Sequence, residues 1–284
     1  MALIPRSYLN CVVTLGARSP KGEVSWIGTG TLVGRLFQTE SNGQKRYHIF
    51  IITNRHVLVN QGDLVVRFNP SNGSTAQNYD IPLYRKNGDP LWKGHSNPEI
   101  DIAAIGIDAD FLEERGAPYN FFQSDEHFMP TQEMSTLGVS EGDFVYVLGF
   151  PMGIASKLRH YVIARSGCIA RIQPALTRDD NDFLIDAMIF PGNSGGPVIY
   201  KPEIISIGGT SSVTKPGLIG IVAGYLTYSD TAISQQTGQA RIVFEENSGL
   251  AVIHPVDFVL ETIEDTFQSA NIKEKINISP ALVQ

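Results

Sequence analysis

The chain has 284 residues, of which 42% are hydrophobic and 18% charged, as expected for a globular protein with one large domain or two modest ones. Its formal net charge is -7 and it has no run of basic residues, which argues against binding to nucleic acid or to an anionic membrane. No uninterrupted apolar stretch approaches the roughly 18 residues that a membrane-spanning helix needs.

The N-terminal segment, MALIPRSYLNCVVTLGARSP, lacks the apolar core and the small-residue cleavage site of a secretory signal. The two cysteines, Cys11 and Cys168, lie far apart among apolar neighbours. Their spacing fits neither a disulfide framework nor a metal site. We therefore expect buried thiols, a reducing compartment and a cytoplasmic protein.

Short runs rich in valine, isoleucine, tyrosine and phenylalanine recur along most of the chain. They are NCVVTLG, GTGTLVGRLF, RYHIFIITN, DLVVRFN, DIAAIGI, DFVYVLGF, YVIARSGCIARI, DFLIDAMIF, GPVIY, LIGIVAGYL and GLAVIHP. Clusters of Gly, Asn, Asp, Pro and Ser separate them, which is typical of an all-β barrel or sandwich. The strands are too many for one small barrel, so we expect two β domains.

Three other segments differ from this pattern. The stretch from Asp108 to Gly138 is the least strand-like and is predicted to be a connector with a helical turn. The polar segment TYSDTAISQQTGQAR, residues 227–241, is predicted to be a surface loop. The segment PVDFVLETIEDTFQSA is predicted to be a helix, because Pro255 opens it and its apolar residues share one face. These residues are Val256, Val259, Leu260, Ile263 and Phe267.

Three segments supply the groups that nucleophilic attack by a serine requires, namely a nucleophile, a base and an acid that orients the base. His56 follows an apolar run in IFIITNRHVLVN, which delivers an imidazole at the end of a strand. Asp101 precedes an apolar strand in NPEIDIAAIGI, where a buried carboxylate needs a partner such as a histidine N–H. Ser194 lies in FPGNSGGPV.

The glycines around Ser194 permit backbone conformations that are forbidden to residues with a Cβ. A tight turn can therefore direct the N–H groups of Gly192 and Ser194 into one hollow beside the hydroxyl group. Such a hollow is an oxyanion hole, in which one donor contributes about 3–4 kcal/mol to stabilising the transition state.

Each feature alone has an ordinary structural explanation. A histidine at a strand end is commonly a structural hydrogen-bonding group, an aspartate before a strand is commonly a turn residue, and Gly-Asn-Ser-Gly-Gly can be a flexible turn. The combination of all three, in the order His, Asp, Ser on an all-β chain, favours catalysis.

The segments TNRHV, DIAAI and GNSGGPV resemble the three catalytic signatures of trypsin-like (chymotrypsin-fold) serine peptidases. The bacterial HtrA-type catalytic domain, without its PDZ domain, is the most similar variant, and the likeness extends from Ser7 to Phe267. It implies an all-β fold of two packed six-stranded antiparallel β-barrels with a C-terminal α-helix. Residues 1–120 would form the N-terminal barrel with His56 and Asp101, and residues 121–284 the C-terminal barrel with Ser194, the helix and a short tail.

The resemblance implies a serine endopeptidase that acts on protein or peptide substrates and needs neither a metal nor another cofactor. His56 would be the general base, Asp101 its orienting acid and Ser194 the nucleophile, with the amides of Gly192 and Ser194 as the oxyanion hole. The alternative is a latent or catalytically silent module of the same fold, which binds extended peptides and is switched on by a regulatory protein partner.

The resemblance also suggests a substrate pocket. Met188, six residues before the serine, would form its floor, and Ala223, Gly224 and Tyr225 would line one wall. These residues predict an apolar pocket that favours small or aliphatic side chains. Asp186, on the strand before the serine, is either a specificity residue or a structural hydrogen-bonding group.

Overall fold

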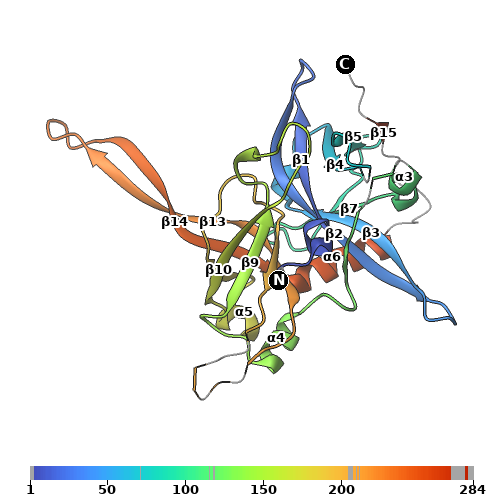
Figure 1. Ribbon diagram of the computed structural model, residues 1–284. Coiled ribbons are helices and arrows are strands. Elements are labelled where there is room, and N and C mark those ends of the chain that lie inside the picture. Colours follow the sequence, from blue (N-terminus) through green and yellow to red (C-terminus); the bar gives the residue numbers. More distant parts are fainter. Residues whose placement is uncertain are drawn as a thin grey trace.

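The structure is a computed structural model that describes residues 3–70, 72–114, 116–117, 119–203, 207–208, 210, 212–269 and 279–280. The fold is mostly β, with a sheet and a barrel packed together and few helices (Figure 1). The helices are α1 (Arg6–Leu9), α2 (Arg55–Leu58), α3 (Ala109–Glu114), α4 (Thr131–Leu137), the 3-10 helix η1 (Pro151–Gly153), α5 (Gln173–Thr177) and α6 (Val256–Ser269).

The N-terminal part of the chain, together with β15 from its C-terminal end, forms a nine-stranded sheet with the order β15-β5-β4-β1-β2-β3-β7-β6, and β8 pairs in parallel with β2. Its strands are β1 (Val12–Arg18), β2 (Val24–Thr39), β3 (Lys45–Thr53), β4 (Asp63–Phe68), β5 (Gln77–Pro82), β6 (Lys93–Gly94), β7 (Ala103–Gly106), β8 (Phe122–Gln123) and β15 (Ser279–Pro280).

This sheet differs from the predicted six-stranded barrel, because its described strands do not close into a ring. At one edge β6 has only two residues and pairs with β7, while at the other edge β15 pairs with β5. The two edges therefore have different partners and do not pair with each other. The boundary expected at residues 120 and 121 stays a prediction.

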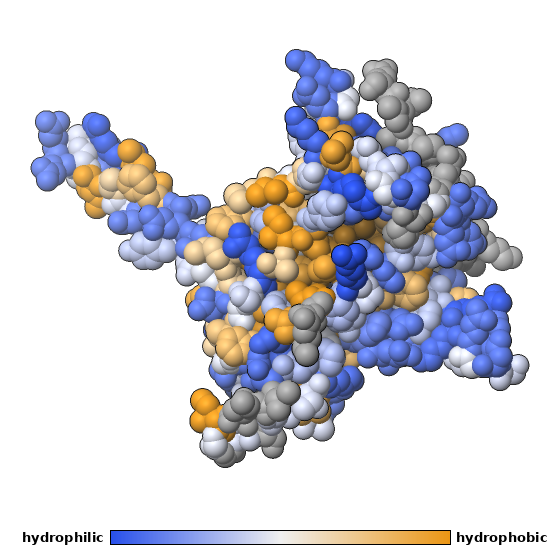
Figure 2. All heavy atoms as spheres, in the orientation of Figure 1, coloured by the Kyte–Doolittle hydropathy of each residue, from blue (hydrophilic) through white to orange (hydrophobic). Residues whose placement is uncertain are grey.

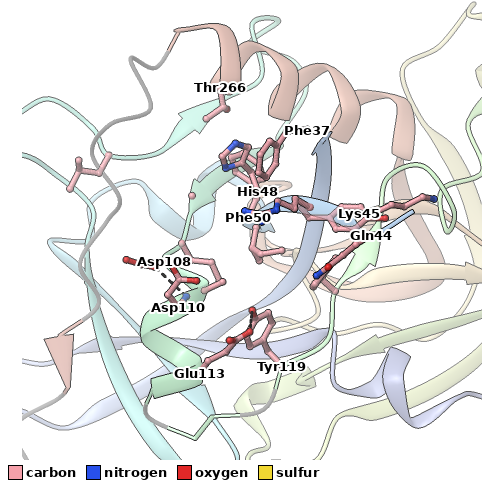
Figure 3. A pocket seen from close by; sticks show the side chains of 18 of the residues that line it. Phe37, Gln44, Lys45, His48, Phe50, Asp108, Asp110, Glu113, Tyr119 and Thr266 are labelled. Atoms are coloured by element: carbon pink, nitrogen blue, oxygen red, sulfur yellow. Dashed lines mark hydrogen bonds between the residues drawn. The ribbon is translucent and has the colours of Figure 1, made fainter. Parts of the chain in front are cut away.

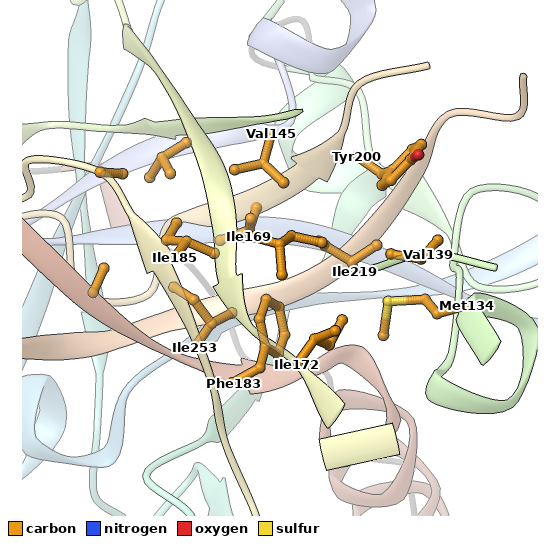
Figure 4. Close-up of a cluster of buried hydrophobic side chains, with 14 of the residues drawn as sticks. Met134, Val139, Val145, Ile169, Ile172, Phe183, Ile185, Tyr200, Ile219 and Ile253 are labelled. Carbon is orange, nitrogen blue, oxygen red and sulfur yellow. The ribbon is translucent and has the colours of Figure 1, made fainter. Parts of the chain in front are cut away.

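The C-terminal part forms the closed six-stranded barrel that the sequence predicted, with the strand order β10-β11-β14-β13-β12-β9. Its strands are β9 (Phe144–Gly149), β10 (Ile163–Arg171), β11 (Phe183–Asp186), β12 (Pro197–Tyr200), β13 (Gly217–Ile233) and β14 (Ala240–Pro255). Inward-pointing aliphatic and aromatic side chains fill the barrel, among them Ile169, Phe183, Ile185, Ile219 and Ile253 (Figure 4). Their burial supplies the main driving force for closing it.

Another buried cluster joins the sheet to the barrel. It contains Phe50 and Ile102 from the sheet and Leu148 and Ile221 from the barrel. Because both units contribute to one apolar interface, residues at its rim keep a fixed spacing. The catalytic candidates lie at this rim, on both sides of it.

Helix α6 starts at Val256, directly after Pro255, as the sequence predicted. Val256, Val259 and Ile263 are fully buried in the cluster between sheet and barrel, while Leu260 and Phe267 are half-buried. The amphipathic face therefore serves to cover the junction of the two units. Of the two free cysteines, Cys11 is buried as expected, but Cys168 is only half-buried.

Residues 227–241 are not the loop that their polarity predicted. Most of them belong to the ends of β13 and β14, which pair as a long ribbon from Thr227 and Asn247 out to Ile233 and Ala240, and only residues 234–239 form the turn between the strands. The ribbon projects from the barrel, and apolar side chains gather along it (Figures 1 and 2). Both of its faces are exposed to solvent, so polar residues occur on each and obscure the period-2 pattern of a strand.

His160 is buried in the loop after η1, facing the end of β4. Its backbone N–H and C=O pair with the side-chain amide of Asn69 at 3.0 and 2.6 Å, but its ring Nδ1 is buried without a hydrogen-bond partner. Burial, reinforced by the charges of Arg67 and Arg159, lowers the pKa of His160 to about 4.

The buried ring makes the folded state sensitive to acid. The unfolded chain binds a proton at this residue near pH 6.5, whereas the folded chain binds it only near pH 4. Stability from this residue is thus complete above pH 6.5 and falls by about 3 kcal/mol as the pH decreases toward 4.

We expect the His160→Phe variant to keep an aromatic ring against Phe150 and to lose this titration. The decrease in the free energy of unfolding between pH 7 and pH 4.5 should shrink by about 2 to 3 kcal/mol relative to wild type. Urea unfolding at the two pH values measures it, with Tyr161→Phe at the exposed neighbour as the control. An unchanged decrease in His160→Phe would show that other groups cause the acid sensitivity.

Candidate active site

The candidate base is held at the end of a central strand. Strand β3 ends at Thr53, whose hydroxyl donates to the Thr29 carbonyl of β2 at 2.9 Å. Asn54 is extended, and the short helix α2 then begins at Arg55. The chain therefore turns out of the sheet at this point, which leaves the His56 side chain 53% exposed at the rim.

The candidate acid lies in the segment between β6 and β7, beside α2. One carboxylate oxygen of Asp101 accepts a hydrogen bond from the His56 backbone N–H at 3.0 Å, and the other pairs with His56 Nδ1. The Asp101 carbonyl accepts from the Asn54 side chain at 2.7 Å. Two contacts from one carboxylate to one histidine fix the orientation of the ring and leave Nε2 as its outward nitrogen.

The candidate nucleophile lies on the barrel, in the turn between β11 and β12. Gly192 and Gly195 have φ values of 98° and 86°, in the region that favours glycine. A Cβ on Gly192 would lie 2.4 Å from the Phe150 carbonyl oxygen, and one on Gly195 would lie 2.1 Å from that of Thr29. Both glycines are therefore required by conformation and by space.

The carbonyl groups of the turn are bonded to the protein, and this determines where its N–H groups point. The Pro191 carbonyl accepts from the Met152 N–H at 2.6 Å, and the Asn193 carbonyl accepts from the Gly196 N–H at 2.8 Å. In a trans peptide the N–H is directed opposite to the C=O. The next amides in the chain, those of Gly192 and Ser194, thus point away from the bonded carbonyls, and among the described residues neither has an acceptor.

Thr29 of β2 ties this turn to the sheet. Its hydroxyl donates to the Gly192 carbonyl at 2.6 Å and accepts from the Phe150 N–H at 3.1 Å, while its own N–H donates to the Ser194 carbonyl at 2.9 Å. Thr29 is fully buried, so these bonds are shielded from water. Sequence reasoning missed this residue, because a threonine in GTGTLVG is also an ordinary strand residue.

Ser194 and His56 line the same cavity, which has a volume of about 310 Å³. Its other lining residues are Ile189, Phe190, Pro191, Val222, Ala223, Gly224 and Tyr225. Both Ser194 and His56 are described by the structure, and no hydrogen bond joins them. The cavity thus contains the nucleophile and base candidates next to a mostly apolar hollow.

Met188 does not line this cavity, although the sequence predicted it at the pocket floor. Its side chain is 49% exposed, whereas its neighbours Ala187 and Ile189 are buried. Side chains of an extended segment alternate between its two faces, so Ile189 points inward and Met188 outward. Asp186 is also exposed and does not line the cavity.

A larger cavity of about 660 Å³ lies on the sheet (Figure 3), and Ser194 is not among its lining residues. His48, Lys45 and Tyr119 are among its lining residues, together with acidic side chains near α3. No serine or cysteine is among the described residues that line it, so the triad candidates do not extend to this face. Within the described part of the chain, no three His, Cys, Asp or Glu side chains are grouped as metal ligands would be.

The closed barrel, the glycine-rich serine turn and a histidine that lines the same cavity are features that a trypsin-like serine peptidase requires. The family model of the trypsin-like peptidase domain matches residues 28–202, and the chain belongs to this family. No helix in the described residues has the length and apolar character needed to cross a membrane.

Two curated relatives support the resemblance to the HtrA-type catalytic domain. The chain is 27% identical over 174 residues to a "Probable periplasmic serine endoprotease DegP-like" of Chlamydia pneumoniae, and 26% identical to its namesake of Chlamydia trachomatis. Each match covers 61% of this chain but only 28% of the relative. These relatives are named as periplasmic, so they do not support the expected cytoplasmic location, which stays a prediction.

Two solved structures were found to be similar. One is the MamO protease domain from Magnetospirillum magneticum in its apo form, with a TM-score of 0.46 and 13% identity over 89% of this chain and 96% of that one. The other is a structure of GrC, with a TM-score of 0.46 and 15% identity over 93% and 97% of the two chains.

Proposed function

We propose that this chain is a serine endopeptidase that hydrolyses peptide bonds through an acyl-enzyme on Ser194. One observation carries the proposal: Ser194 and the Asp101-bound His56 border one cavity, beside two backbone amides that have no acceptor among the described residues. A nucleophile, an oriented base and oxyanion donors are the parts that acyl transfer requires.

The reaction follows from these positions. His56 Nε2 takes the proton of the Ser194 hydroxyl as Oγ bonds to the substrate carbonyl carbon, and the C=O electron pair moves to the oxygen. The amides of Gly192 and Ser194 bind that oxyanion. When it collapses, the C–N bond breaks and the imidazolium gives its proton to the leaving amine. Water then repeats both steps, releasing the acid and restoring Ser194.

Strand β13 supports an extended peptide as the substrate. It pairs with β12 from Gly217 to Ile221, and beyond this no described strand pairs with that edge, which runs past Ala223 and Gly224 at the cavity. An extended chain can add to such an edge through main-chain hydrogen bonds. The chlamydial relatives are named endoproteases, which agrees with protein substrates.

The cavity lining supports a preference for apolar side chains on the acyl side of the cut bond. Ile189 and Val222 are buried and Ala223 is half-buried, and no Lys, Arg, Asp or Glu is among the described residues that line the cavity. A charged side chain would lose its hydration without gaining a partner.

We expect a peptide library to be cleaved after aliphatic residues, with kcat/KM at least about 100-fold higher than after Lys, Arg, Asp or Glu. Mass spectrometry of the products identifies the cut bonds, and the Ser194→Ala protein shows which cuts come from a contaminant. Cleavage mainly after a charged residue would refute the assignment of this pocket but not the peptidase itself. A library left intact by the wild-type protein would count against the peptidase proposal.

A further inference from the structure

His254 is a buried histidine with a partner on each ring nitrogen. It lies on β14, and 3% of its surface is exposed. Its Nδ1 pairs with a carboxylate oxygen of Asp182, just before β11, and its Nε2 lies 3.0 Å from the backbone nitrogen of Asp101. The chain of contacts thus runs from Asp182 through His254 to the residue that binds His56.

The partners determine the protonation of the ring. The N–H of Asp101 can only donate, so His254 Nε2 accepts from it and carries no proton. The proton of the neutral ring is therefore on Nδ1, where it is donated to Asp182. Asp182 selects the tautomer that can bind the Asp101 amide, in the way that a carboxylate orients any histidine it binds.

The contact is valuable because it crosses between the two units. Other hydrogen bonds to Asp101 come from Asn54, Arg55 and His56, which directly follow β3 of the sheet. His254 and Asp182 belong to the barrel, which also carries Ser194. This is the one hydrogen bond from a described barrel residue to Asp101.

We propose that His254, oriented by Asp182, is a positioning residue that sets the acid and base of the sheet at the correct distance from the serine of the barrel. The inference rests on the proposed function, because it assigns these residues to that catalytic site. His254 touches no substrate atom in this proposal and acts only through Asp101. A misplacement of the reacting groups by about 1 Å can cost 100-fold in rate.

Two variants separate the contacts of the ring. In His254→Asn the amide lies near the former Nδ1, so it still reaches Asp182 but offers no acceptor to Asp101. In His254→Gln the longer side chain places an oxygen near the former Nε2, where it can accept from the Asp101 N–H. We expect kcat to fall at least about tenfold in His254→Asn with KM little changed, and to be largely restored in His254→Gln.

The same substitutions in an Asp101→Asn background show whether His254 acts through Asp101. We expect His254→Asn to lower kcat by less than about twofold there, because the group that it positions is already lost. His127→Leu is the control. The ring of His127 also accepts a backbone N–H, that of Gln123 at its Nδ1 at 2.9 Å, but it lies outside the site. The leucine offers no acceptor, and this variant should leave kcat unchanged.

The rate of labelling of Ser194 by a fluorophosphonate, measured together with kcat, keeps the two proposals distinguishable. If the wild type is labelled and active, three results would overturn the positioning role alone. They are no loss of kcat in His254→Asn, equal losses in His254→Asn and His254→Gln, or the full loss retained in the Asp101→Asn background. A wild type that is neither labelled nor active would overturn both. If His254→Asn does not fold, Asp182→Ala is used instead, because it keeps the buried ring. Its effect on kcat is then compared in the wild-type and the Asp101→Asn backgrounds.

Discussion

Peptide hydrolysis by the Ser194→Ala variant is expected to fall by at least about 10⁴-fold in kcat. The alanine lacks the Oγ that forms the acyl bond, and neither His56 nor the two amides can replace it. The fold should be unaffected, because Ser194 is joined to the sheet through its carbonyl, which accepts from Thr29 N–H, and this bond remains. Steady-state hydrolysis of the best library peptide measures the loss.

A serine outside the cavity provides the control for this variant. Ser166 is exposed on β10, and Ser166→Ala should retain wild-type kcat. The thermal midpoints of both variants should stay within about 2 °C of wild type. If Ser194→Ala hydrolyses peptides at an unchanged rate, Ser194 is not the nucleophile.

Gly192→Ala is expected to lower kcat by about 10² to 10³, the cost of losing one oxyanion donor. The added Cβ would lie 2.4 Å from the Phe150 carbonyl oxygen and 3.1 Å from the Met152 nitrogen, so the Gly192 peptide must move. That movement turns its N–H away from the cavity. Substrate binding is less affected, so the loss should appear in kcat more than in KM.

Gly43→Ala separates this effect from simple backbone strain. Gly43 has a similar φ of 84°, but a Cβ there would meet no atom within 4 Å. In both variants the positive φ of the new alanine destabilises the folded state by about 1 kcal/mol. Only in Gly192→Ala does the added Cβ also overlap with neighbouring atoms. Equal, small effects of the two substitutions on kcat would mean that the Gly192 amide does not contribute to the reaction.

The sequence predicted those parts of the fold in which local pattern and packing agree. Helix α6 has a proline start and one apolar face, and the barrel strands alternate around a single apolar interior. The ribbon of β13 and β14 was missed because no core imposes a pattern on its exposed faces. The open edge of the first sheet depends on pairing between β5 and β15, which are distant in sequence.

Some residues of the candidate site could likewise be predicted from the sequence, and others could not. His56, Asp101 and Ser194 stand in short motifs that can be found by residue type and order. Thr29 and His254 reach the site through contacts over more than 150 positions, and each looks like an ordinary strand residue in its own segment. Met188 is exposed and does not line the cavity, because counting back from the serine does not determine which side chains of the segment after β11 turn inward.

The most direct test of a catalytic Ser194 is the mass of the purified protein after reaction with a fluorophosphonate probe, followed by peptide mapping. We expect a single adduct, on Ser194, without any added partner, and a labelling rate that falls strongly in His56→Ala. An adduct that forms only after addition of cell extract would favour the latent alternative. No adduct under either condition, or an adduct on another residue, would contradict the proposed peptidase.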